Sequence, residues 1–142
     1  MKVSFLSAQN LKKSDLNKFL KEIDILTIHC PLNKKTENLI SLKELKLMKK
    51  DSIIINTARG GIVNEVDLVH ALNKKIISAA GIDVTTMEPP KKTHPYYRII
   101  NSPNFIWTPH TAWASDETLK NALDQLIENI NAYYLGKPKN LV

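Results

Sequence analysis

The chain has 142 residues, 43% hydrophobic and 24% charged, as expected for one globular domain. Its net charge of +6 suggests nucleic-acid binding, but the lysines are scattered pairs without interleaved aromatic residues, which argues against it. No apolar run is long enough to span a membrane, and no signal peptide is recognisable. A single cysteine, Cys30, excludes an internal disulfide, so a soluble cytoplasmic protein is expected.

The first part of the chain alternates between strand and helix patterns. A brief apolar run at 3–6 predicts a strand, and Ser14 is placed to cap a short helix to about residue 21. A second strand is predicted at 24–29, where β-branched residues are frequent. Ser41 and Glu44 have the spacing of a capping box, which predicts a helix from there to about residue 48.

The alternation continues beyond residue 50. Residues 52–56 and 77–84 are apolar without period-two alternation, which is typical of strands buried on both faces of a parallel sheet. Asn64 can cap the helix that lies between these two strands. Residues 85–102 are rich in proline and polar groups and are predicted to form a long loop, a feature that is uncommon unless it is functional.

A last short strand is predicted at 105–108. Ser115 then caps a long helix with apolar residues at helical spacing, which ends at Gly136. Because strands and helices alternate throughout, the sequence predicts an α/β fold, a Rossmann-like parallel sheet with helices on both faces.

Polar residues follow four of the predicted strands. Ligands of such sheets bind beyond the carboxyl ends of the strands, so these residues are the candidate site. They are His29-Cys30-Pro31, Asn56-Thr57-Ala58-Arg59-Gly60, Asp83 with Glu88 close behind, and Thr108-Pro109-His110.

The chemistry of three of these side chains is complementary. A histidine beside a carboxylate can give or take a proton near neutrality, and an arginine can bind a carboxylate through two bonds. Arg59, Glu88 and His110 therefore suit an acidic carbonyl substrate, but they supply no electrons, so a hydride has to come from a cofactor. Taken singly, each can also be structural: a solvated turn arginine, a loop acid and a buried histidine. The histidines and Cys30 show no close-spaced ligand pair, so no metal site is expected.

Four ordered runs of residues carry a family resemblance. They are His29-Cys30-Pro31-Leu32, Ile55-Asn56-Thr57-Ala58-Arg59-Gly60-Gly61, Gly81-Ile82-Asp83-Val84 with Glu88-Pro89-Pro90, and Thr108-Pro109-His110-Thr111-Ala112-Trp113. In order and spacing they resemble the D-isomer-specific 2-hydroxyacid dehydrogenases over essentially the whole chain. The run from Ala112 to Ser115 is most similar to the glycerate dehydrogenase/hydroxypyruvate reductase branch.

The resemblance implies a role for each residue. His110 would protonate the substrate carbonyl as hydride arrives, Glu88 would hydrogen-bond His110, and Arg59 would bind the substrate carboxylate. Asp83 would hold the nicotinamide carboxamide, and Trp113 would border the substrate pocket. The remaining residues implied to line the cofactor, together with Arg59, Asp83 and His110, are Cys30, Pro31, Thr36, Thr57 and Ala58.

The sequence departs from the family pattern near its beginning. Its four glycines, at 60, 61, 81 and 136, do not form the Gly-x-Gly-x-x-Gly turn that binds the cofactor pyrophosphate in the family. Ser7 follows the first predicted strand, where the family has an acid that binds the adenosine ribose. Without that acid there is no repulsion against a 2′-phosphate, so NAD or NADP is expected as cofactor.

These observations define the expected scope of the chain. Residues 1–114 are predicted to be part of the NAD(P)-binding domain, and residues 115–142 a helix that returns to a substrate domain lying outside this chain. We expect an oxidoreductase fragment for a small 2-hydroxy or 2-keto acid, inactive alone and homodimeric in the full-length protein. Two alternatives stay open: a non-catalytic, corepressor-like binding module, and a Rossmann-like domain whose motif residues are structural.

Overall fold

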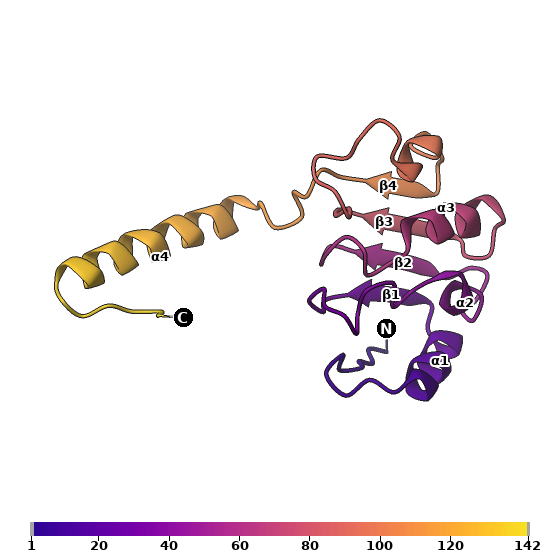
Figure 1. Cartoon of the computed structure of the whole chain (residues 1–142), viewed down its shortest axis with the longest axis horizontal. Coiled ribbons are helices and arrows are strands. Elements are labelled where there is room, and N and C mark those ends of the chain that lie inside the picture. The colour runs from indigo at the N-terminus through magenta and orange to yellow at the C-terminus, as the bar shows by residue number, and fades with distance from the viewer. Residues whose placement is uncertain (1, 142) are drawn as a thin grey trace. The chain divides into compact units, whose positions relative to one another are not determined.

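Four of the predicted strands pair into one parallel sheet in chain order (Figure 1). They are β1 (Ile25–Ile28), β2 (Ile53–Asn56), β3 (Ala79–Ile82) and β4 (Phe105–Trp107). The computed structural model describes residues 2–141, which divide into two compact units, 2–110 and 111–141. The sheet belongs to the first unit, so the prediction of a Rossmann-like parallel α/β fold is confirmed.

The register of the sheet brings the candidate residues to one edge. Ile28 pairs with Asn56, Asn56 with Ile82, and Ile82 with Trp107, so all four strands end side by side. The polar residues that follow these strands therefore leave the sheet at the same edge. The alternative of a Rossmann-like domain with purely structural motif residues would be favoured by strand ends that point to different places. The strand ends meet at one edge, which argues against that alternative.

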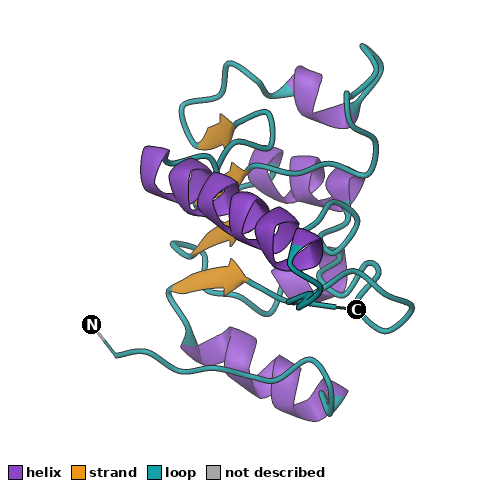
Figure 2. Cartoon of the chain, turned by 90° about the vertical axis from the view of Figure 1, so that its left-hand side faces the viewer, coloured by secondary structure: helices purple, strands orange, loops and turns teal. Residues whose placement is uncertain are grey.

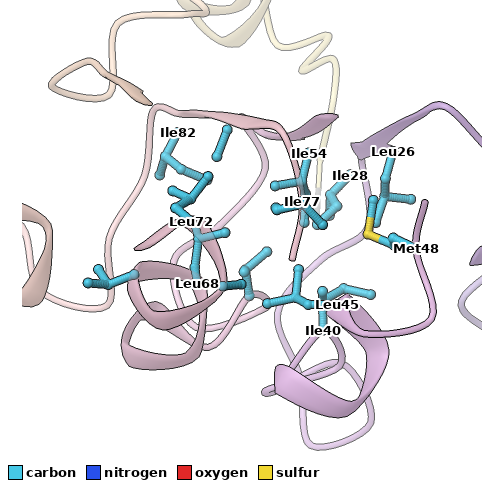
Figure 3. Packing of buried hydrophobic residues seen from close by; sticks show 14 of the residues in the cluster. Leu26, Ile28, Ile40, Leu45, Met48, Ile54, Leu68, Leu72, Ile77 and Ile82 are labelled. Carbon is cyan, nitrogen blue, oxygen red and sulfur yellow. The ribbon is translucent and has the colours of Figure 1, made fainter. Parts of the chain in front are cut away.

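The first unit contains three α-helices and one 3-10 helix, with α2 and α3 on one face of the sheet in both views (Figures 1 and 2). They are α1 (Lys13–Glu22), α2 (Leu42–Leu45), α3 (Glu65–Asn73) and η1 (Pro95–Arg98). Alternate strand residues such as Leu26, Ile54 and Ile82 pack against side chains of these helices, including Leu45 and Leu68, in one continuous core (Figure 3). Burial of these aliphatic side chains is the main stabilising contribution to the unit.

The second face of the sheet is less covered than predicted. The strand residues that alternate with the core are half-buried or exposed, and Ile25 and Ile106 are 50% and 68% exposed. Helices on both faces were expected because these runs lack period-two alternation in sequence. The described helices of the first unit contribute to a single core.

Local cap chemistry accounts for several helix boundaries. The capping box of Ser41 and Glu44 is formed, with the Ser41 N–H donating to Glu44 Oε2 at 3.1 Å, although α2 ends at Leu45 and not at residue 48. The Asn64 side chain caps α3 by accepting the Asp67 N–H at 3.0 Å. Both caps are recognisable in the sequence because they depend on residues three apart.

Two predictions near the N-terminus are wrong. Residues 3–6 form no strand and are exposed, because they do not pair with an edge of the sheet. Ser14 does not cap α1, which begins at Lys13 after the N-cap residue Lys12.

The predicted loop 85–102 also contains the short η1 helix, anchored by Tyr96, whose side chain is almost fully buried.

The second unit consists mainly of α4 (Asp116–Tyr134). As predicted, the Ser115 side chain caps it by accepting the Thr118 N–H at 3.2 Å, and Gly136 ends it with φ of +69°, a value that glycine adopts without strain. Ala132 is the buried residue of this helix. Across residues 2–141, none of the helices combines the length and apolarity needed to cross a membrane.

Candidate active site

The ends of β2, β3 and β4 are joined by backbone hydrogen bonds that continue past the strands. The Asp83 N–H donates to the Asn56 carbonyl at 3.0 Å, and the His110 N–H donates to the Asp83 carbonyl at 2.8 Å. The Thr108 hydroxyl bonds the Asp83 carboxylate. This extended pairing carries Asp83 and His110 to the same place on the rim.

His110 and Glu88 form a direct pair on this rim. His110 Nδ1 lies 2.6 Å from Glu88 Oε2, although the two residues are 22 positions apart. The imidazole is about one third exposed, as is the carboxylate, so the pair faces solvent while remaining held. Because Nδ1 is bonded to Glu88, proton exchange with a ligand falls to Nε2.

Glu88 is itself fixed by its second oxygen, since Oε1 accepts the Thr85 N–H at 2.9 Å. Partial burial raises the pKa of Glu88, but the hydrogen bonds from His110 and Thr85 outweigh it, and its pKa is lowered overall. Glu88 is therefore an anion at neutral pH. An anion at this position favours an imidazole that donates from Nδ1.

The backbone at His110 has φ of +56°, in the left-handed region that non-glycine residues rarely adopt. The bond from the His110 N–H to Asp83 holds this conformation. Unusual backbone geometry of this kind clusters at functional sites, where the surrounding structure compensates for its cost. The turn after β4 thus directs His110 toward Glu88.

A pocket of about 480 Å³ opens beside the pair. Its polar wall is made by His110, Glu88 and Asp83, and much of the remainder is apolar. The other lining residues are Thr85, Pro89, Pro90, Tyr97, Ile100, Trp107, Thr108 and Pro109. The pocket therefore places a proton-transfer pair next to a site large enough for a small organic ligand.

Arg59 is on the same rim but does not line this pocket. Its side chain is exposed, and Nη1 donates to the Ala58 carbonyl at 2.6 Å. Its backbone is held by Asn56, whose side chain donates to the Arg59 carbonyl at 2.9 Å and accepts the Ala58 N–H at 3.1 Å. The structure thus brings Glu88, His110 and Asp83 together, and leaves the Arg59 guanidinium on the neighbouring strand end.

The residues predicted to line a cofactor fall into two groups. Asp83 is buried at the rim, with Thr57 exposed and Ala58 half-buried after the adjacent strand. Cys30, whose thiol pKa is raised by burial, and Pro31 follow β1.

Thr36 lies in the loop after β1, buried, where its hydroxyl donates to the Pro31 carbonyl at 2.7 Å and accepts the Asn33 N–H at 2.8 Å. The Thr36 hydroxyl therefore stabilises the conformation of the loop after β1. Its contribution to a cofactor site would be to position the backbone of this loop.

Ser7 and Trp113 lie outside the strand ends that form the rim in the first unit. Ser7 is exposed in a segment that is not a strand, so the positional argument from a strand end has no structural support. Trp113 belongs to the second unit, which begins at Thr111, four residues earlier than the predicted boundary at 115. The roles of both residues stay predictions.

Sequence reasoning missed a second histidine–carboxylate pair. His94 Nε2 lies 2.8 Å from Glu65 Oε2, and both side chains are buried. It also missed Tyr97 and Ile100 in the pocket wall. The only signal was the unusual length of the 85–102 loop, which marks a functional segment without identifying its residues. Among residues 2–141, no three His, Cys, Asp or Glu side chains are grouped as metal ligands.

Comparison with known proteins decides the family. Residues 2–112 match the family described as "D-isomer specific 2-hydroxyacid dehydrogenase, NAD binding domain". The chain belongs to the D-isomer specific 2-hydroxyacid dehydrogenases. The predicted family is therefore confirmed, and the site described above is the strand-end rim of its NAD-binding domain.

Several members of the family are similar over nearly all of this chain. It is 45% identical over 128 residues to a glycerate dehydrogenase of Methylorubrum extorquens, covering 90% of this chain and 40% of that protein. It is 36% identical over 137 residues to a hydroxypyruvate reductase of Blautia hydrogenotrophica, covering 96% of this chain and 42% of that protein. The crystal structure of D-lactate dehydrogenase with NAD⁺ from Lactobacillus jensenii superposes with a TM-score of 0.82 at 34% identity, covering 89% and 41%.

The chain spans about two fifths of the length of these relatives. Its residues fit one end of the dinucleotide that the family description names. The buried Asp83 carboxylate offers oxygen acceptors beside His110, as a carboxamide requires. The 142 residues contain no Gly-x-Gly-x-x-Gly turn for the pyrophosphate. The fit is therefore to the nicotinamide end.

Proposed function

We propose that this chain provides the proton-transfer and nicotinamide-binding part of an NADH-dependent 2-hydroxyacid dehydrogenase that interconverts hydroxypyruvate and glycerate. The observation that carries the proposal is the 2.6 Å pair of His110 Nδ1 and Glu88 Oε2 beside the buried Asp83 and an open pocket. The substrate is suggested by the names of the glycerate dehydrogenase and hydroxypyruvate reductase relatives.

Each residue has a defined task in this reaction. A nicotinamide held beside Asp83 would supply the hydride that reduces the carbonyl carbon. His110 Nε2 donates a proton to the carbonyl oxygen, and Glu88 stabilises the imidazolium that donates it. Arg59 exchanges its bond to Ala58 for two bonds to the substrate carboxylate. Asp83 accepts hydrogen bonds from the carboxamide.

The other assignments rest on the family resemblance. Cys30, Pro31, Thr36, Thr57 and Ala58 are proposed to line the cofactor. Trp113 is proposed to border the substrate, and Ser7 to lie toward the adenosine ribose. We infer a homodimer for the complete protein and a reducing compartment such as the cytoplasm, where Cys30 remains a free thiol. NADP is a weaker candidate than NAD, because its case depended on a strand ending at Ser7.

The chain alone is expected to show no turnover of hydroxypyruvate with NADH or NADPH, because it lacks the glycine turn and the substrate domain. It should still bind NADH weakly. We expect NADH to shift the NMR amide signals of Thr57, Ala58 and Asp83. Asp83→Asn should weaken this binding about tenfold, as expected when a charge-assisted hydrogen bond becomes neutral.

The matched control is Asp51→Asn, an exposed acid that precedes β2 and lies outside the carboxyl edge of the sheet. It should bind NADH like the unaltered chain. Unchanged signals at Asp83 throughout an NADH titration would rule out the cofactor assignment. Measurable NADH oxidation by the chain alone would rule out its inactivity.

A further inference from the structure

Glu65, the first residue of α3, holds the loop that carries Glu88. Its Oε1 accepts the Thr86 N–H at 2.7 Å, and its Oε2 accepts the Thr86 hydroxyl at 2.9 Å. The same Oε2 lies 2.8 Å from His94 Nε2. The Glu65 side chain is only 10% exposed, so these three bonds replace most of its hydration. A carboxylate bound in this way has little freedom to move.

His94 extends this attachment to β4. Its Nδ1 accepts the Tyr96 N–H at 3.3 Å, so the ring hydrogen lies on Nε2 and is donated to Glu65. The ring stacks on Trp107 with centroids 5.6 Å apart and meets Tyr96 edge-on at 4.8 Å. Trp107 is the last residue of β4, three positions before His110. Glu65 is thus linked to both partners of the candidate proton-transfer pair.

The peptide between Thr85 and Thr86 contributes one of two successive N–H groups that donate to two different carboxylates. The Thr85 N–H donates to Glu88 Oε1 at 2.9 Å, and the next N–H along the chain donates to Glu65 Oε1. Gly60 packs directly against this peptide, since a Cβ at position 60 would lie 1.9 Å from the Thr85 carbonyl carbon. The position of the Thr85–Thr86 backbone therefore contributes to where the Glu88 carboxylate lies relative to His110.

We propose that Glu65 and His94 are positioning residues for the His110–Glu88 pair, acting by fixing the Thr85–Thr86 peptide from α3. This proposal rests on the proposed function, which gives the His110–Glu88 pair its role in proton transfer. The contacts themselves belong to the chain alone, so they are testable without cofactor or substrate. A failure of catalysis and a failure of positioning are therefore distinguishable.

The test is NMR of the 142-residue chain at neutral pH, following the ring nitrogens of His110 and the amide exchange of Thr86. Glu65→Ala should speed exchange of the Thr86 amide roughly tenfold, about the effect of losing one hydrogen bond. It should also move the His110 ring signals more than halfway toward those of Glu88→Gln. Glu65→Gln keeps an oxygen for the Thr86 N–H but turns an NH2 toward the His94 Nε2–H, so it should move the His110 signals in the same direction and by less than Glu65→Ala does.

Asp67→Ala is the matched control, because Asp67 lies in the same first turn of α3 but binds the Leu42 N–H, at 2.8 Å. It should leave the His110 ring unchanged. If Glu65→Ala does not fold, Glu65→Asp, which keeps the charge but shortens the side chain, should move the His110 signals in the same direction. The proposal is overturned if the folded Glu65 variant leaves the His110 signals unchanged, or if Asp67→Ala moves them equally.

Discussion

Two histidine–carboxylate pairs lie close in this structure, and their exposure separates their roles. The side chains of His110 and Glu88 are 35% and 38% exposed, whereas those of His94 and Glu65 are 7% and 10% exposed. The exposed pair can meet a ligand, and solvent screening leaves it little effect on stability. The buried pair is inaccessible and acts through the peptide and the rings that it contacts.

The contact between Gly60 and Thr85 is where a single methyl group should matter most. Gly60→Ala would place its Cβ 1.9 Å from the Thr85 carbonyl carbon, a backbone atom that cannot turn aside. We expect a loss of about 3 kcal/mol in the free energy of unfolding, measured by urea denaturation, as for severe overpacking.

Gly81→Ala is the matched control, since a Cβ there would meet only Ile55 Cγ1 at 4.0 Å, an ordinary contact. It should change stability by less than about 1 kcal/mol. Equal effects of the two substitutions would contradict the close packing of Gly60 against the loop.

At the scale of elements, caps and register position the site. The Asn64 cap starts α3 one residue before Glu65, so Glu65 leaves the helix terminus toward the 85–88 loop. The parallel register then brings the ends of β2, β3 and β4 together. The capping box of α2 also connects two elements, because Glu44 Oε1 lies 3.1 Å from the Lys13 ammonium of α1.

Glu44 provides a test of pH dependence. Burial raises its pKa, but bonds from Ser41 and Lys13 outweigh that effect, and the pKa is lowered from 4.5. A lowered folded-state pKa stabilises the fold above about pH 4.5, and this contribution is lost as pH falls through the folded-state value. Glu44→Gln should cost about 1 kcal/mol at pH 7, and the difference from the unaltered chain should shrink as pH falls below 4.5.

Urea denaturation at several pH values measures this difference. Glu37→Gln, at an exposed glutamate in the preceding loop, is the control and should change stability little at any pH. A Glu44→Gln difference that stays constant from pH 7 to pH 3 would show that the carboxylate is not linked to folding.

At the scale of the whole molecule, the second unit has an apolar helix face that is not covered by other described residues of that unit. The residues that form this face are Leu119, Leu123, Leu126, Ile127 and Ile130, each between 39% and 60% exposed. Apolar patches of this kind favour association. In the full-length protein the same face is predicted to return to the substrate domain.

We expect the isolated chain to self-associate through this face, with an apparent mass that rises with concentration in sedimentation velocity. The double variant Leu123→Lys and Ile130→Lys should sediment as a monomer. Asn121→Lys with Gln125→Lys adds the same charge to the opposite face and should behave like the unaltered chain. A monomer at every concentration tested would contradict this prediction.

Much of the architecture followed from local patterns in the sequence. Strand and helix positions, the caps at Ser41, Asn64 and Ser115, and the candidate residues after each strand depend on residues close together in the chain. The predictions of a strand at 3–6 and of a cap at Ser14 were wrong. A short apolar run does not determine which strand it pairs with, and a lone serine does not determine which N–H it accepts from.

The sequence by itself determined the parallel α/β fold and the identity of Arg59, Glu88 and His110 as candidates, because periodicity and motif spacing are local properties. The tertiary structure brings His110 within 2.6 Å of Glu88, as the family resemblance implied, and it alone decided that Arg59 stays outside the pocket. It alone revealed Glu65 and His94, which are 29 residues apart. The physical reason is that hydrogen bonds act over about 3 Å, and chain folding, not sequence distance, determines which groups come that close.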